Sequence, residues 1–207
     1  AVAADGRSGD GAGVLTQLPY ALMVRELAKT GARAPAMGDL AVGMIFLPLR
    51  NLVHRARCVD LVQQAAGEFG VELLGWREAP IDLDALGDWA MSLRPYIAQV
   101  FIGRPAALAP GASFERVLYL LRKRATQLAW AESITNFYIA SLSSQTLVYK
   151  GLFMAPQLRK FYLDLADPDY RTALAVFHQR YSTNTFATWE RSQPFLLLCH
   201  FGVINSL

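Results

Sequence analysis

The stretch from His178 to Phe186 contains the residue types best suited to holding a small polar ligand. A strand-like run ends there in small and hydrogen-bonding residues, with Arg180 just before them. An arginine guanidinium is a planar fork of donors that suits a carboxylate, and clustered hydroxyl and amide groups can fix a polar ligand. From the residues alone, a ligand-binding loop and a capped turn are equally good interpretations.

The glycine-rich run Gly9-Asp10-Gly11-Ala12-Gly13 could also be a phosphate-binding loop. A dinucleotide-binding loop needs a strand before it and a helix directly after it, and neither flank fits here. The spacing of Asp5 and Asp10 does not match a calcium-binding loop. The run therefore favours a tight turn that brings the backbone close to other elements.

Cysteine and histidine chemistry is weakly indicated. Cys199 and His200 are adjacent on an expected strand, so their side chains point to opposite faces and cannot form a nucleophile–base pair. Cys58 lies near two arginines that could lower its pKa, but a thiol packed in a helix is the better interpretation. The three histidines and two cysteines lack metal-ligand spacing, and we expect no metal.

Hydrophobic patterning predicts alternating strands and helices, with two strands forming a hairpin at Ser144-Gln145. Because several consecutive strands are expected to adjoin as hairpins, we expect an α+β fold of antiparallel sheets rather than a doubly wound parallel sheet. The expected strands are 14–18, 41–47, 71–76, 96–102, 136–143, 146–151, 172–181 and 195–205, and the expected helices are 20–29, 51–69, 82–92, 113–129 and 158–165.

Composition narrows the class of protein. Apolar residues make up 53% and charged residues 18%, with a mean hydropathy of +0.23, which indicates surface for neighbouring domains. No apolar run reaches the roughly 18 residues of a membrane-spanning helix, so we expect no membrane contact. The basic clusters 50–57 and 122–124 are typical of solvated helix faces, and we expect no nucleic acid.

Two cysteines favour a reducing, cytoplasmic location. The first residue is not Met and the last lie in an apolar run, so we expect a fragment.

Six segments, in order along nearly the whole chain, resemble the glutaminase domain of glutamate synthases. The segments are Asp5–Leu15, Val42–Pro48, Gly75–Pro80, Phe137–Gly151, His178–Phe186 and Gln193–Phe195. The Arg-Tyr-Ser-Thr core of the fifth segment is shared with other class II amidotransferases, whereas several of the other segments are specific to glutamate synthases.

The resemblance implies an N-terminal-nucleophile hydrolase fold, an αββα sandwich of two antiparallel sheets, of which residues 1–207 are a part incomplete at both ends. In this family an N-terminal cysteine, with its own α-amino group as base, attacks the side-chain amide carbon of glutamine. A thioester forms, ammonia leaves, and water then releases glutamate. The ammonia serves the reductive amination of 2-oxoglutarate at a second site.

The resemblance also assigns roles to residues. Arg180 is expected to pair with the glutamine α-carboxylate, Thr183 to hydrogen-bond the same substrate, and the Gly202 backbone N–H to donate to the oxyanion. Phe201 stands where the family has the oxyanion asparagine, and phenylalanine has no polar donor. Val203 likewise replaces an acid, and Leu196 stands where the family favours arginine.

We therefore expect part of a glutamate synthase, a fragment that is itself inactive because Phe201 lacks the donor and the nucleophilic cysteine is expected in a preceding segment. The alternative is a non-catalytic glutamine-binding or assembly domain derived from an amidotransferase. Another class II amidotransferase, making nucleotides or amino sugars, is disfavoured by the Gly75–Arg77 and Phe137–Gly151 segments. We expect no cofactor in this chain, with FMN and an iron–sulfur cluster elsewhere in the parent. The expected partners are glutamine, the remaining domains, and a small electron-donating subunit or ferredoxin.

Overall fold

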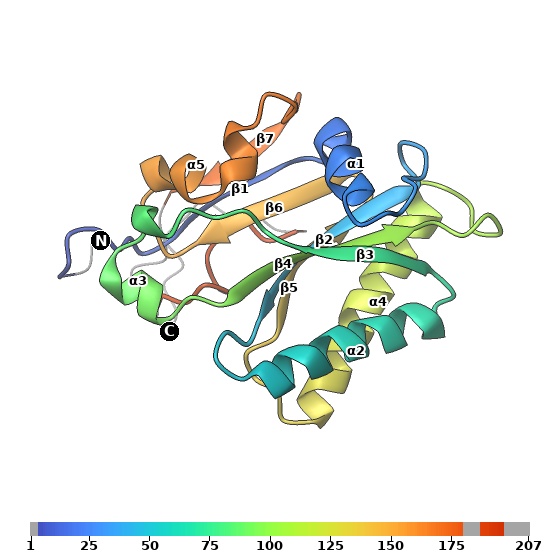
Figure 1. Cartoon of the computed structure of the whole chain (residues 1–207), viewed down its shortest axis with the longest axis horizontal. Helices are drawn as coiled ribbons and strands as arrows, with labels where there is room; N and C mark the ends of the chain where they lie inside the picture. Colours follow the sequence, from blue (N-terminus) through green and yellow to red (C-terminus); the bar gives the residue numbers. More distant parts are fainter. Residues whose placement is uncertain (1–3, 180–186, 197–207) are drawn as a thin grey trace, which may run out of the picture.

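The computed structural model describes residues 4–179 and 187–196, which form two antiparallel sheets with helices (Figure 1). The first sheet has the order β6-β1-β7 and the second the order β3-β4-β2-β5. This confirms the expected α+β class. The strands are β1 (Ala12–Gln17), β2 (Leu40–Leu47), β3 (Glu72–Glu78), β4 (Tyr96–Gly103), β5 (Tyr138–Ser143), β6 (Thr146–Gly151) and β7 (Ala175–His178).

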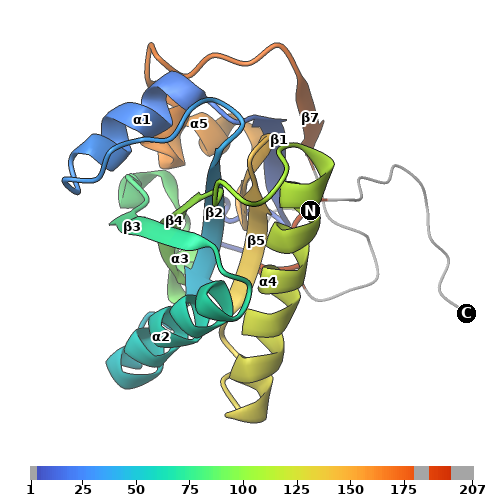
Figure 2. The same ribbon diagram turned by 90° about the vertical axis from the view of Figure 1, so that its right-hand side faces the viewer.

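Helices α2 (Leu52–Glu68) and α4 (Ala112–Ala131) pack on one side of the second sheet, away from α1 (Tyr20–Ala28) and α5 (Leu158–Phe161) (Figures 1 and 2). In α2 the buried residues recur at helical spacing, as in Cys58, Leu61, Val62 and Ala65. The Asn51 side chain accepts a hydrogen bond from the His54 backbone N–H and so caps this helix.

The expected hairpin at Ser144-Gln145 is wrong, because β5 and β6 belong to different sheets. β5 pairs with β2, and β6 pairs with β1. The chain changes sheet in a turn that is held by side chains. Ser143 Oγ accepts from the backbone N–H groups of Gln145 and Thr146, and the Glu115 carboxylate accepts from the N–H and hydroxyl of Ser144. Consecutive strands with a short connection therefore bridge the two sheets instead of pairing.

Three other expectations need correction. The expected helix 82–92 is a 3₁₀ turn (Leu83–Ala85) followed by α3 (Asp88–Ser92), with Gly87 between them. The expected helix 158–165 is α5 followed by a second 3₁₀ turn (Leu163–Ala166), because Tyr162 forms an isolated bridge with Ile81. Within the described part of the expected strand 172–181, the strand is limited to β7, since the Thr172 hydroxyl accepts from the Gln17 backbone N–H and donates to the Leu174 backbone oxygen instead. Most of the expected strand 195–205 lies outside the described residues.

A buried polar network ties the two sheets together. Arg77 of β3 lies 2.5 Å from the carboxylate of Asp164 and 2.6 Å from the side-chain oxygen of Gln99. The Tyr149 hydroxyl of β6 donates to the same Asp164 at 2.7 Å, and Glu26 of α1 accepts from Arg77 at 3.0 Å. Burial, together with the Asp164 carboxylate, holds the pKa of Tyr149 well above its usual value, so this hydroxyl stays a donor.

Lys150 of β6 is a charged residue outside this network, and it is wholly buried. Its Nζ donates to the Glu190 backbone oxygen at 2.7 Å and to the Tyr138 hydroxyl at 3.1 Å. Burial lowers its pKa to about 7, because a low-dielectric surrounding disfavours the charged amine.

Replacing Arg77 by methionine should lower the free energy of unfolding by about 3–5 kcal/mol, because Asp164 then keeps a buried charge without a counter-ion. Denaturant titration of the purified protein checks this. The matched control is Arg57→Met, whose partner Glu132 is exposed, and the unfolding midpoint should barely move. Equal effects of the two substitutions would contradict a special role for the network.

Lys150 should make stability rise with pH between about 7 and its unfolded pKa of 10.5. In that window the unfolded lysine holds a proton that the folded lysine has released, so the free energy of unfolding gains about 1 kcal/mol per pH unit. Unfolding titrations of the natural protein and Lys150→Met at pH 7, 8 and 9 measure this difference. Parallel pH dependences of the two proteins would show that Lys150 does not titrate differently on folding.

Candidate functional site

The four residues to which the sequence assigns roles in substrate binding or in the oxyanion site lie outside the described residues. These are Arg180, Thr183, Phe201 and Gly202. The structure does describe the two segments that flank Arg180 and Thr183: strand β7, which ends at His178, and residues 187–196. The position of these flanks defines where the stretch 180–186 begins and ends.

The first flank, strand β7, pairs with strand β1. In the register of the sheet His178 lies opposite Gly13, and Gly13 in turn lies opposite Lys150. A Cβ atom at Gly13 would come 2.5 Å from the Gln193 backbone oxygen and 2.6 Å from the Cβ of Lys150. Only glycine lets the second flank pass so close to β1, so the glycine at position 13 has a steric reason.

Residues 187–196 are fixed by contacts with the core. Trp189 is buried, its indole N–H donates to the Ala90 backbone oxygen at 3.2 Å, and its ring packs against Phe46, Phe153 and Phe161. The Ser192 hydroxyl lies 3.2 Å from the Gly151 backbone oxygen.

Lys150 adds a third anchor to the same segment. Besides its hydrogen bond to Glu190, its Nζ lies 4.6 Å from the ring centroids of Tyr138 and Phe195. Sequence reasoning missed this residue. The available signal was a lysine at the end of the apolar run Leu147-Val148-Tyr149, where the strand pattern predicts burial.

The glycine-rich segment before β1 forms a turn that caps α3, and this confirms the expected close approach to other elements. The Asp5 carboxylate accepts from the backbone N–H groups of Ser8 and Trp89, and the Ser8 hydroxyl accepts from that of Ala90. Hydrogen bonds from the Ser8 hydroxyl and backbone hold the pKa of Asp5 well below its usual range. A Cβ at Gly9 would come 2.5 Å from the Phe153 carbonyl carbon, so this turn also packs against the chain after β6.

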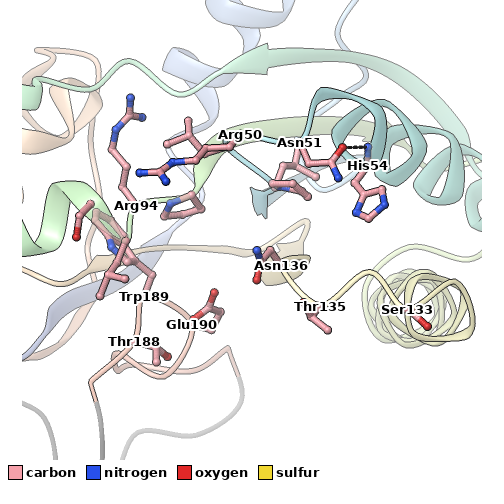
Figure 3. Close-up of a pocket in the computed structure, with 16 residues that line it drawn as sticks. Arg50, Asn51, His54, Arg94, Ser133, Thr135, Asn136, Thr188, Trp189 and Glu190 are labelled. Carbon is pink, nitrogen blue, oxygen red and sulfur yellow. Dashed lines mark hydrogen bonds between the residues drawn. The ribbon is translucent and has the colours of Figure 1, made fainter.

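A polar cavity of about 510 Å³ lies beside the second flank, at the ends of β2 and α4 and the starts of α2 and β4. Figure 3 shows Arg50 and Arg94 on one wall, with Glu190 and Asn136 across from them. Among the described residues, neither guanidinium has a hydrogen bond or ion pair. Two guanidinium groups on one wall suit a carboxylate or phosphate. Thr188, Trp189 and Glu190 line the cavity, so the second flank forms part of its wall.

Several arginines of the basic clusters are engaged in contacts between elements, although within the described residues Arg50 is not among them. Arg55 lies over the Tyr96 ring at 4.1 Å, Arg57 pairs with Glu132, and Arg124 pairs with Glu68. These contacts join α2 to β4 and to α4 and its C-terminal end, so these arginines stabilise the packing of the helices on the sheet.

Cys58 is buried in α2, and burial raises the pKa of its thiol to about 11, as expected for a packed thiol. The other cysteine, Cys199, lies outside the described residues, as does His200. Within residues 4–179 and 187–196, no group of three or more His, Cys, Asp or Glu side chains is placed to hold a metal ion. The helices of this part of the chain are too short or too polar to cross a membrane.

Comparison with known proteins places these features in a family. A family model described as "Glutamine amidotransferases class-II" matches residues 1–207. The chain is 42% identical over its whole length to the glutamate synthase [NADPH] large chain of Azospirillum brasilense, covering 14% of that protein. It is 40% identical over 98% of its length to the corresponding large chain of Bacillus subtilis, covering 13%, and 40% identical over its whole length to the glutamate synthase [NADH] of Schizosaccharomyces pombe, covering 10%.

The chain thus spans about a seventh or less of the length of these relatives. Its match runs through both flanks of the stretch 180–186 and through the glycine-rich segment that packs beside them. The chain belongs to the class II glutamine amidotransferase family and is similar to the glutamate synthase large chains within it.

Proposed function

We propose that this chain is part of the glutamine-hydrolysing domain of a glutamate synthase, which releases ammonia from glutamine for the reductive amination of 2-oxoglutarate. The observation that carries this proposal is the similarity to glutamate synthase large chains over the whole chain, at 35–42% identity. Residues 1–207 form part of one amidotransferase domain, whose two sheets belong to an αββα sandwich. The two antiparallel sheets of the described residues support this.

Arg180 pairs with the α-carboxylate of glutamine and Thr183 hydrogen-bonds the same molecule. Three anchors support these roles: the pairing of His178 with β1, the burial of Trp189, and the bond from Lys150 to Glu190. They fix both ends of the stretch between His178 and Trp189, and a site with fixed ends loses little entropy when glutamine binds.

Phe201 limits catalysis. The backbone N–H of Gly202 donates one hydrogen bond to the oxyanion that forms when a thiolate attacks the amide carbon. The side chain at position 201 should donate a second, and phenylalanine cannot. The buried Cys58 thiol does not replace the nucleophile, because its raised pKa leaves almost no thiolate at neutral pH. We propose that these 207 residues alone do not hydrolyse glutamine and that a preceding segment supplies the nucleophilic cysteine.

A second candidate function follows from the same residues. Arg180 and Thr183 are present while Phe201 replaces the oxyanion donor, which is the pattern of a domain that binds glutamine without hydrolysing it. Such a domain would serve assembly or ligand sensing.

The remaining domains of the parent are the proposed partners. Several apolar side chains are at least two-thirds exposed, including Leu52 (67%), Val53 (78%) and Trp130 (72%), and these suit contact with neighbouring domains. FMN and an iron–sulfur cluster belong to those domains, and electrons come from a small subunit or ferredoxin. The low cysteine content supports a cytoplasmic location.

Replacing Phe201 by asparagine in the full-length parent should raise glutamine hydrolysis by on the order of 10² or more, because the amide restores an oxyanion donor. The measurement is ammonia release from glutamine, with the natural protein and the variant side by side. Tyr119→Asn is the control, since this aromatic residue of α4 is 39% exposed, lies outside both flanks of the stretch 180–186 and should leave activity unchanged.

The three outcomes separate the candidate functions. A large gain confirms an amidotransferase site with a lesion at Phe201. Equal activity of the two proteins would show that position 201 does not donate to the oxyanion. No activity in either, with glutamine still bound, favours the binding domain.

Arg180→Lys in the same parent should weaken glutamine binding by about 10- to 100-fold, since lysine cannot form the two parallel hydrogen bonds to a carboxylate. Titration calorimetry with L-glutamine gives the Kd, which is independent of turnover. Arg171→Lys, at an exposed arginine, is the control and should bind like the natural protein. An unchanged Kd in Arg180→Lys would remove Arg180 from the substrate site.

A further inference from the structure

The proposed reaction has no step for Lys150, although this lysine is wholly buried. Its two hydrogen-bond acceptors come from different parts of the chain: the Tyr138 hydroxyl from β5 and the Glu190 backbone oxygen from the segment 187–196. The rings of Tyr138 and Phe195 face the same ammonium group. Lys150 therefore joins β6, β5 and the segment 187–196 at one point.

The register of the first sheet places Lys150 in line with the other flank as well. Lys150 lies opposite Gly13, and Gly13 lies opposite His178, two residues before Arg180. Strand β7, which precedes the stretch 180–186, thus pairs with β1 at Gly13, and the segment 187–196, which follows that stretch, contacts β1 and β6 at Gly13 and Lys150.

We propose that Lys150 is a positioning residue for glutamine binding: it fixes the backbone at Glu190 and so sets where the substrate-binding stretch must end. This inference rests on the proposed function. Lys150 does not touch the substrate, and it acts through the segment 187–196.

The choice of lysine supports a specific role over simple packing. A methionine could fill a buried space of this length without the cost of burying an amine. Lysine instead supplies donors to a backbone oxygen that lies outside any helix or strand, in either its charged or its neutral form. The charged groups that act on it are the carboxylate of Glu190, which favours the ammonium form, and Arg122 of α4, which opposes it.

The test uses the full-length parent with Lys150→Met, and Arg77→Met as control. Arg77 is also a largely buried charge, with 11% of its side chain exposed, but it contacts Glu26, Gln99 and Asp164 rather than the segment 187–196. Two quantities are measured: the Kd for L-glutamine by calorimetry, and the hydrogen-exchange rates of the backbone amides of residues 187–196.

We expect Lys150→Met to weaken glutamine binding at least 10-fold and to speed exchange in residues 187–196. Arg77→Met should lower the melting temperature but keep the Kd within about twofold. Unchanged exchange in Lys150→Met, or faster exchange with an unchanged Kd, would overturn the proposal. If Lys150→Met does not fold, Lys150→Gln decides: it keeps a polar side chain but is too short to keep the hydrogen bond to the Glu190 backbone oxygen, and a Kd equal to that of the natural protein would overturn the proposal.

Failure of the proposed function is distinguishable from failure of this inference. If the natural parent does not bind glutamine, the proposed function fails and with it the role in substrate binding. The exchange rates would still show whether Lys150 holds the segment 187–196.

Discussion

The arrangement around the expected substrate-binding stretch depends on the absence of a side chain at Gly13. Within the described residues β1 is the strand of its sheet that has neighbours on both sides, and Gly13 is where a third segment crosses it. The Gln193 carbonyl occupies the space where a Cβ would be, and Lys150 and His178 flank the same position. Any larger residue would push apart the three segments that meet there.

Two sets of buried polar contacts then hold the two sheets and the segment 187–196 in place. The Arg77–Asp164 network fixes the sheets to each other, and Lys150 fixes the segment 187–196 to the sheets. Both use charged groups with nearly complete sets of partners, which is the condition under which buried charges are tolerated. The apolar clusters provide most of the buried surface. The polar contacts determine which arrangement of the strands and helices can bury that surface and still pair these charged groups.

The sequence predicted the α+β class and most strands and helices, because these depend on local periodicity and turn residues. It failed at Ser144-Gln145, where a short connection implies a hairpin but Glu115, distant in sequence, holds a turn between two sheets. It also failed at Gly87, where Asp5 and Ser8 supply the helix cap from outside. For the site, motif resemblance named Arg180 and Thr183, but no local pattern could show that Lys150 anchors Glu190, since that contact joins residues far apart in sequence.

The passage of the chain between sheets at Ser144-Gln145 has a consequence for biosynthesis. β1 is made well before its partner β6, which pairs with it from Ala12 opposite Gly151 to Gln17 opposite Thr146. At a ribosomal rate of about 5–20 residues per second, β1 must wait on the order of ten seconds for that partner. During this interval both edges of a strand rich in apolar residues remain open to other chains. Nascent-chain chaperones would therefore be needed most before β6 emerges, and the second sheet, whose strands β2 to β4 are closer in sequence, can form first.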